Sequence, residues 1–141
     1  MTGFLLDTNV VSETIKVRPD DAVLAWLARR DQQIFVPTIA IAEIKLGIEM
    51  LPTSRRRTSF EDWFSDLLAN DFADRILPFD TAAAWAFGEL VARARRRGHP
   101  TPVADAQIAA VATVHDLTVA TRDIADFAGF GVPLVNPFEG A

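Results

Sequence analysis

The stretch Phe4-Leu5-Leu6-Asp7-Thr8-Asn9-Val10 combines a short apolar run with an acid at its end. Such an uninterrupted run favours a strand that is buried on both faces, as in a parallel sheet. An isolated carboxylate in apolar surroundings is costly and tends to take up a proton. We therefore predict a buried strand over residues 3–6, with Asp7 at its carboxyl end as either a turn-forming residue or a functional one.

Beyond this strand, short apolar segments alternate with helical patterns. We expect strands at 34–36, 75–79, 117–120 and 132–135, the last at a sheet edge. We expect helices at about 19–30, 38–50, 54–69, 80–97 and 101–115, and a helical turn at 123–127. The alternation predicts one α/β domain over residues 1–141, with a mostly parallel sheet covered on both faces.

Three helix starts depend on single residues. Thr38 is the expected N-cap of the second helix, and Pro102 is expected at the first helical position of the last long one. The helix at 54–69 has an alternative start at Thr58, because Thr58-x-x-Glu61 has the form of a capping box.

Composition narrows the class of protein. The 141 residues are 50% hydrophobic and include no cysteine and two histidines, which excludes a disulfide framework and argues against a zinc site. The net charge of −5 argues against a surface covered in nucleic-acid-binding charge. No apolar run approaches the roughly 18–20 residues of a membrane span, and no signal peptide is recognisable. We expect a soluble cytoplasmic protein that does not bind membranes.

Three further acids resemble Asp7 in their placement. Glu43 interrupts an apolar helix, Asp105 opens the alanine-rich stretch 104–114, and Asp123 follows the apolar run at 117–121. Ligands gather at the carboxyl ends of strands in α/β sheets, and both Asp7 and Asp123 follow strands. Converging carboxylates repel one another, and Mg²⁺ or Mn²⁺ would neutralise them. If the four converge, the chain is a metal-dependent enzyme acting on phosphates.

Each acid also has a structural interpretation. Asp7 and Asp123 suit helix N-caps or turns, and Asp105 in a first helical turn complements the helix dipole. Glu43 is more informative, although a structural salt bridge is an alternative there. We expect it to point into the interior or a cleft, because it shares a helix face with Ile39, Leu46, Gly47 and Met50.

Arginines and tryptophans give two further expectations. Arg55, Arg56 and Arg57 lie at the start of the helix at 54–69, where cations are disfavoured, so we predict contact with a phosphate backbone. A solvated loop before a helix that begins at Thr58 is the alternative.

The three tryptophans fall on apolar helical stripes and are expected in the core: Trp26, Trp63 and Trp85.

The motifs together resemble PIN-domain proteins, and specifically the VapC-type toxin ribonucleases of type II toxin–antitoxin systems. The resemblance extends in order over essentially the whole chain. It rests on Leu5-Leu6-Asp7-Thr8-Asn9-Val10 with Ser12-Glu13, Ala42-Glu43-Ile44-x-x-Gly47, Asp105-Ala106-x-Ile108-Ala109 and Thr121-Arg122-Asp123-x-x-Asp126-Phe127.

The resemblance implies a Rossmann-like three-layer sandwich, in which helices flank a central, mostly parallel sheet. It also implies a catalytic quartet that holds Mg²⁺ or Mn²⁺: Asp7, Glu43, Asp105 and Asp123. The metal is assigned mainly to the first and third of these acids, Asp7 and Asp105. Thr8 and Thr121 would supply hydroxyls that orient carboxylates or water. Asp126 is an extra acid to which we assign no role.

The family's function would be metal-dependent endoribonucleolytic cleavage of RNA, neutralised by a cognate VapB-type antitoxin. The resemblance further implies a homodimer, and binding to operator DNA through the antitoxin. A non-catalytic PIN-like module that binds protein or RNA is the alternative. A haloacid-dehalogenase-type phosphatase fits less well, because it would need an aspartate in place of Asn9 and a lysine after Lys45, which is the last one.

Overall fold

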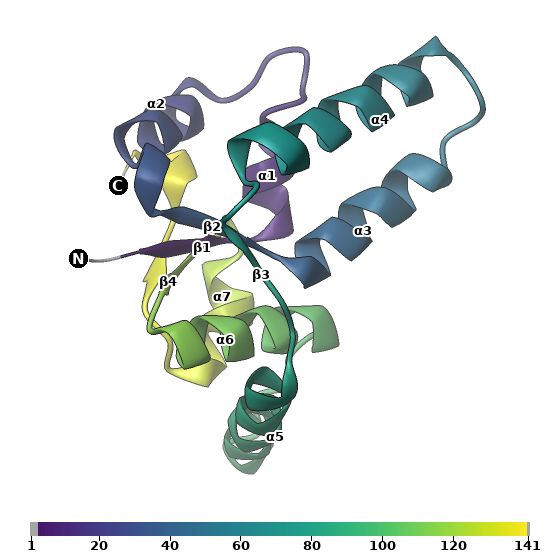
Figure 1. The fold of residues 1–141 in the computed structure, drawn as a ribbon. Helices are drawn as coiled ribbons and strands as arrows, with labels where there is room; N and C mark the ends of the chain where they lie inside the picture. Colours follow the sequence, from purple (N-terminus) through teal and green to yellow (C-terminus); the bar gives the residue numbers. More distant parts are fainter. Residues whose placement is uncertain (1–2, 141) are drawn as a thin grey trace.

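The centre of the molecule is a five-stranded sheet in which all four strand pairings are parallel. The computed structural model describes residues 3–140. The strand order is β3-β2-β1-β4-β5, so that β1 lies in the middle (Figure 1). The strands are β1 (Phe4–Leu6), β2 (Ile34–Pro37), β3 (Ile76–Leu77), β4 (Thr118–Ala120) and β5 (Leu134–Val135). The predicted parallel sheet is confirmed, with β3 and β5 as its short edge strands.

Seven α-helices connect and flank the strands within the described residues. They are α1 (Thr8–Glu13), α2 (Asp21–Arg29), α3 (Thr38–Glu49), α4 (Arg55–Asp66), α5 (Thr81–Arg96), α6 (Val103–His115) and α7 (Ile124–Phe127). A π-helical turn at Leu67–Asp71 extends α4. The short helix α1 was not predicted, although Asp7 was considered as an N-cap.

Consecutive residues of the central strands face opposite sides of the sheet. Leu5 and Val119 belong to a core shared with α5, α6 and α7. Leu6 and Ala120 belong to a second core, shared with α1, α2, α3 and α4. Figure 1 shows these two groups of helices on opposite sides of the sheet. The predicted three-layer sandwich is therefore confirmed, and the helix of each acid is anchored to a core.

Two predicted helix starts differ from those observed, whereas the predicted start of α4 near residue 54 is confirmed. The N-cap of α4 is Ser54, whose hydroxyl accepts a hydrogen bond from the N–H of Arg57 at 3.2 Å. The alternative start at Thr58 is therefore wrong. Thr38 is not an N-cap, because its hydroxyl accepts from the N–H of Phe79 at 3.2 Å. Pro102 is the N-cap of α6 and not its first residue.

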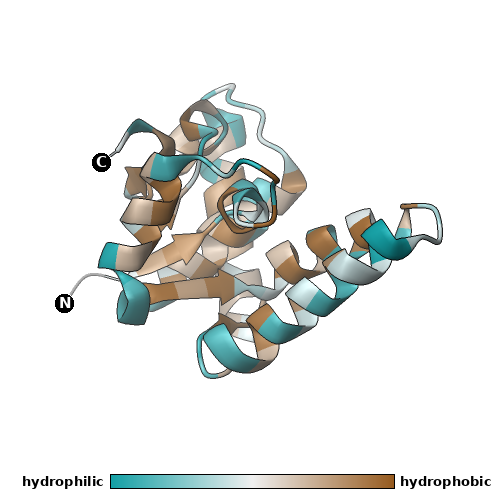
Figure 2. Ribbon diagram, turned by 90° about the horizontal axis from the view of Figure 1, so that it is seen from above, coloured by the Kyte–Doolittle hydropathy of each residue, from teal (hydrophilic) through white to brown (hydrophobic). Residues whose placement is uncertain are grey.

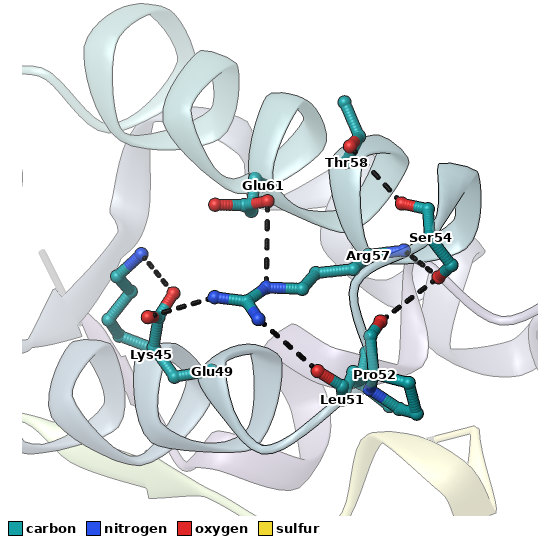
Figure 3. A network of polar contacts seen from close by, with 8 residues as sticks. All are labelled: Lys45, Glu49, Leu51, Pro52, Ser54, Arg57, Thr58 and Glu61. Carbon is teal, nitrogen blue, oxygen red and sulfur yellow. Dashed lines mark hydrogen bonds and ion pairs between the residues drawn. The ribbon is translucent and has the colours of Figure 1, made fainter.

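Helices α3 and α4 form an arm that extends away from the sheet (Figures 1 and 2). Figure 3 shows the polar network between them. The Arg57 guanidinium forms ion pairs with Glu49 at 3.0 Å and Glu61 at 3.8 Å, and it donates to the carbonyl of Leu51 at 3.3 Å. Glu49 also pairs with Lys45 at 2.9 Å. One half-buried arginine thus links the two helices at their turn.

Several apolar side chains expected inside lie on the surface. Leu46 and Met50 on α3 are 63% and 77% exposed, so the face that Glu43 shares with them points outward and not into the interior. Trp85 on α5 is 76% exposed, so its predicted core position is wrong, whereas Trp26 is fully buried. No helix within residues 3–140 is long and apolar enough to cross a membrane.

Candidate acidic active site

The four predicted acids come from four separate elements. Asp7 is the N-cap of α1 just after β1, and Asp123 is the N-cap of α7 after β4. Glu43 lies on α3 and Asp105 in the first turn of α6. Because β1 and β4 are parallel neighbours, their carboxyl ends lie at one edge of the sheet. The charges of the other three acids act on Asp105, so the fold brings the quartet into one neighbourhood.

Asp7 is the most deeply placed of the four, with 5% of its surface exposed. Burial raises its pKa above the ordinary value of 3.8. Hydrogen bonds from the Thr121 hydroxyl and the Thr8 N–H, both at 2.8 Å, oppose that rise in pKa. The negative charges of Glu43 and Asp123 add to it. The predicted neighbour Thr121 therefore does bond to Asp7, which orients the carboxylate.

Asp105, in the first turn of α6, has a strongly raised pKa. Burial, as the main cause, and the negative charges of Asp7, Asp126, Glu43 and Asp123 together raise the pKa to about 7. No side chain within residues 3–140 donates a hydrogen bond to it. Its two oxygens are thus free to bind an incoming cation, which would remove the repulsion.

Glu43 is exposed and faces a groove between α1, α3 and α4. Its Oε1 atom accepts a hydrogen bond from the Thr8 hydroxyl at 2.6 Å, so the second predicted threonine also contacts the quartet. The groove has a volume of about 240 Å³, and Ile44, Phe60 and Trp63 contribute to its apolar wall. The expectation of a cleft is met, whereas that of a buried interior position is wrong.

Asp123 occupies an N-cap position without capping the helix, because its side chain makes no bond to the start of α7. Its Oδ2 atom instead accepts a hydrogen bond from the Asn9 side chain at 3.1 Å. Its backbone N–H donates to the Thr121 hydroxyl at 2.9 Å. The sequence analysis assigned no role to Asn9. Its position in the polar triplet Asp7-Thr8-Asn9, directly after β1, is the feature that could have indicated one.

A second unpredicted feature supports the loop that carries Asp123. The buried carboxylate of Glu13 lies 2.8 Å from Lys16 and 3.6 Å from Arg122, and it accepts from the N–H of Asp20 at 2.9 Å. The bond from Lys16 is the main cause that lowers the pKa of Glu13. The Arg122 guanidinium also lies 3.8 Å from the ring centre of Phe138. Arg122, next to Asp123, is thus fixed from two sides.

The three predicted phosphate-binding arginines have different surroundings. Arg57 is occupied by the network of the α3–α4 arm. Arg56 lies over the ring of Phe60, 5.3 Å from its centre, and Arg55 is exposed near the turn. Contact of these residues with RNA stays a prediction, for which Arg55 and Arg56 are the more accessible of the three.

The oxygen donors of the quartet suit a hard divalent cation. Three hydrogen bonds reach Asp7, from Thr8, Thr121 and Asn9, so about one of its four lone-pair positions is left. Within residues 3–140, no three acidic or histidine side chains lie close enough together to enclose a metal ion. Mg²⁺ usually keeps several waters and needs only one or two carboxylates, so Asp7 and Asp105 fit a partly hydrated ion.

Comparison with known proteins places the chain in a family. Residues 4–130 match the PIN domain family. VapC ribonuclease Y4jK of Sinorhizobium fredii is 39% identical over 138 residues, which is 97% of this chain and 99% of the relative. Toxin FitB of Neisseria gonorrhoeae is 36% identical over 136 residues, or 96% and 98% of the two chains. The structure of FitAB bound to an IR36 DNA fragment superposes with a TM-score of 0.88 at 35% identity, over 96% of this chain and 95% of that one. The chain therefore belongs to the PIN domain family, as its motifs predict.

Proposed function

We propose that this chain is a VapC-type toxin, an endoribonuclease that hydrolyses RNA phosphodiester bonds with Mg²⁺ or Mn²⁺. The observation that carries the proposal is the convergence of four carboxylates at the carboxyl edge of the sheet, with the pKa of Asp105 raised to about 7. Such uncompensated negative charge is typical of sites that bind a cation. The VapC ribonuclease that matches nearly the whole chain supports the choice of RNA. An RNA substrate also suits a cytoplasmic protein.

In this mechanism Asp7 and Asp105 would hold a divalent cation, and Glu43 and Asp123 would contribute to its surroundings directly or through water. A bound cation lowers the pKa of a water molecule and stabilises the charge that develops on the phosphate oxygens. Glu43 or Asp123 takes the proton of the attacking water. Thr121 keeps Asp7 in one orientation, and Thr8 does the same for Glu43.

We also propose that a cognate VapB-type antitoxin neutralises the toxin and carries the pair to operator DNA, with the toxin as a homodimer. Two apolar hollows border α1 and α4. One of about 330 Å³ also borders α2, and one of about 240 Å³ also borders α3. Trp63 contributes to both. The similar structure of FitAB bound to DNA supports this partnership.

The test is cleavage of a mixed RNA substrate by purified protein, with Mg²⁺, with Mn²⁺ or with EDTA, beside Asp105→Asn. We expect cleavage that requires the metal and is lost in the variant. Full activity of a folded Asp105→Asn protein would refute the assignment of the site.

A second candidate is a PIN-like module that binds RNA or protein without cutting. The observation in its favour is that, within residues 3–140, no three acidic or histidine side chains lie close enough together to hold a metal ion. Titration calorimetry with Mn²⁺ separates the two candidates. An absence of metal binding together with an absence of cleavage would favour the non-catalytic module.

A further inference from the structure

We propose that Asn9 is a positioning residue that holds the carboxylates of Asp7 and Asp123 together before a cation binds. The inference rests on the proposed function for its catalytic consequence, but not for its geometry. Asn9 lies in the first turn of α1, and Val10 and Val11 beside it are buried, so its backbone is fixed to the core.

All the hydrogen-bonding groups of the Asn9 side chain have partners. The Nδ2 atom donates to Oδ2 of Asp7 at 3.2 Å and to Oδ2 of Asp123 at 3.1 Å. The Oδ1 atom accepts from the backbone N–H of Arg122 at 3.3 Å. The two carboxylates and the Arg122 N–H therefore determine the orientation of the Asn9 amide, because the reversed amide would place its oxygen against both carboxylates.

Within residues 3–140, no other side chain bonds to both of these carboxylates. Thr121 comes nearest, since its hydroxyl donates to the Asp7 side chain but accepts only from the backbone of Asp123. The Arg122 side chain is fixed between Glu13 and Phe138 and steadies the loop without contacting either acid. Asn9 is thus the residue that orients the Asp123 carboxylate itself.

An amide suits this position better than a charged group. A lysine would neutralise the acids and compete with an incoming cation, whereas an aspartate would add a third negative charge. The asparagine donates two hydrogen bonds without changing the net charge. It brings the acids together and leaves in place the negative charge that attracts a metal ion.

The first test follows amide exchange by NMR in metal-free protein. We expect both Nδ2 protons of Asn9 to be protected from exchange, and one of them to lose protection in Asp123→Ala. Asn9→Ala and Asn9→Asp should both speed exchange at the Asp123 N–H. The aspartate keeps the shape of the side chain but cannot donate, so a role in packing alone predicts that Asn9→Asp behaves as wild type. That result would overturn the proposal.

The second test measures function in the same variants. Supporting contacts of this kind typically contribute 10–100-fold to metal affinity or activity, so Asn9→Ala should lower Mn²⁺ affinity and kcat by roughly that factor, with the KM for RNA nearly unchanged. Ser54→Ala is the control, because it also removes a side-chain hydrogen bond, the one that caps α4, and should leave exchange at Asp123 unchanged.

The two proposals fail in different ways. If wild-type protein does not cut RNA but the Asn9 protons are protected as expected, the positioning role stands and the nuclease function falls. If wild-type protein cuts RNA and Asn9→Ala keeps its kcat and Mn²⁺ affinity, the nuclease stands and the role of Asn9 is refuted.

Discussion

The charged form of Asp105 is disfavoured by burial and by the neighbouring negative charges. Its substitution should therefore have opposite effects on activity and on stability. In Asp105→Asn we expect no cleavage but a metal-free protein more stable by about 1 kcal/mol, a value reduced from the full pKa shift because the side chain is partly exposed. Thermal unfolding in EDTA should show a Tm higher by about 2–4 °C. Asp62→Asn removes an exposed charge on α4 and should leave Tm almost unchanged. A lower Tm in Asp105→Asn would contradict this account.

The same residue predicts how stability depends on pH without metal. The pKa of Asp105 is about 7 in the folded protein against a reference of 3.8, so the folded state binds more protons than the unfolded state between these values. Stability should therefore fall as pH rises from about 4 to 7. The raised pKa of Asp7 acts in the same direction. Urea unfolding at pH 5 and pH 7 in EDTA measures this slope, and Asp105→Asn should reduce it.

Glu13 limits the range of that prediction at the acidic end. Its pKa is lowered from 4.5, so its stabilising contribution is complete above that value and is lost as pH falls through the lowered pKa. Measurements between pH 5 and pH 7 avoid this opposing effect. A rise in stability from pH 5 to pH 7 in metal-free protein would contradict the assignment to Asp105.

At the residue scale, local sequence indicated the acids but not what holds them. Asp7 and Asp123 could be found because each follows an apolar strand. The roles of Asn9 and Glu13 depend on partners far along the chain, Asp123 and Arg122, which no local pattern reveals. For Glu43 the sequence left open an interior position or a cleft, and the structure shows the cleft, because periodicity identifies an apolar face but not whether another element covers it.

Among the elements, the α3–α4 arm is held together by polar contacts of Arg57. Arg57→Ala should remove its bond to Leu51 and its pairs with Glu49 and Glu61, at a cost of up to about 1 kcal/mol. We expect faster amide hydrogen exchange in α4 and at the turn before it, with protection of the sheet unchanged. Arg55→Ala, at an exposed position, should leave exchange in the arm unchanged.

The central strand gives a prediction with an internal control. Leu5 and Leu6 are almost fully buried on opposite faces of the sheet, and Leu46 is 63% exposed. Leu5→Ala and Leu6→Ala should each lower the free energy of unfolding by about 2–5 kcal/mol, and Leu46→Ala by much less. Chemical denaturation measures all three. Equal costs for Leu6→Ala and Leu46→Ala would contradict the assignment of the two cores.

Element type could be predicted from sequence better than element ends. Alternating strands and helices predicted the parallel sheet, whereas the sequence left two starts open for α4, one near Ser54 and one at Thr58. Both residue types suit an N-cap, and the Glu61 side chain that would complete a capping box at Thr58 lies instead near Arg57. The ion pair of Glu61 with Arg57 thus leaves Thr58 without a capping box, and α4 begins after Ser54.

At the scale of the whole molecule, exposed apolar side chains predict self-association. Trp85, Met50 and Leu46 are each more than half exposed, and large exposed apolar residues often mark an interface. We expect a mass above that of the monomer in sedimentation at micromolar concentration, reduced in Trp85→Ser. Ile124, at 36% exposure, offers a comparison: Ile124→Ser should have less effect if α5 forms the contact. A monodisperse wild-type monomer would contradict the expected homodimer.

The pairing of β1 with β4 has a consequence for the timing of synthesis. The strand that ends at Asp7 leaves the ribosome early, but the neighbour that leads to Asp123 is made only after most of the chain. Chains grow at about 5–20 residues per second, so several seconds separate the two acids. During that interval an unfinished polypeptide contains only part of the quartet, so under the proposed function it would be unable to cut RNA. If the chain is the proposed toxin, its incomplete copies would leave the RNA of the cell intact, including the message being translated.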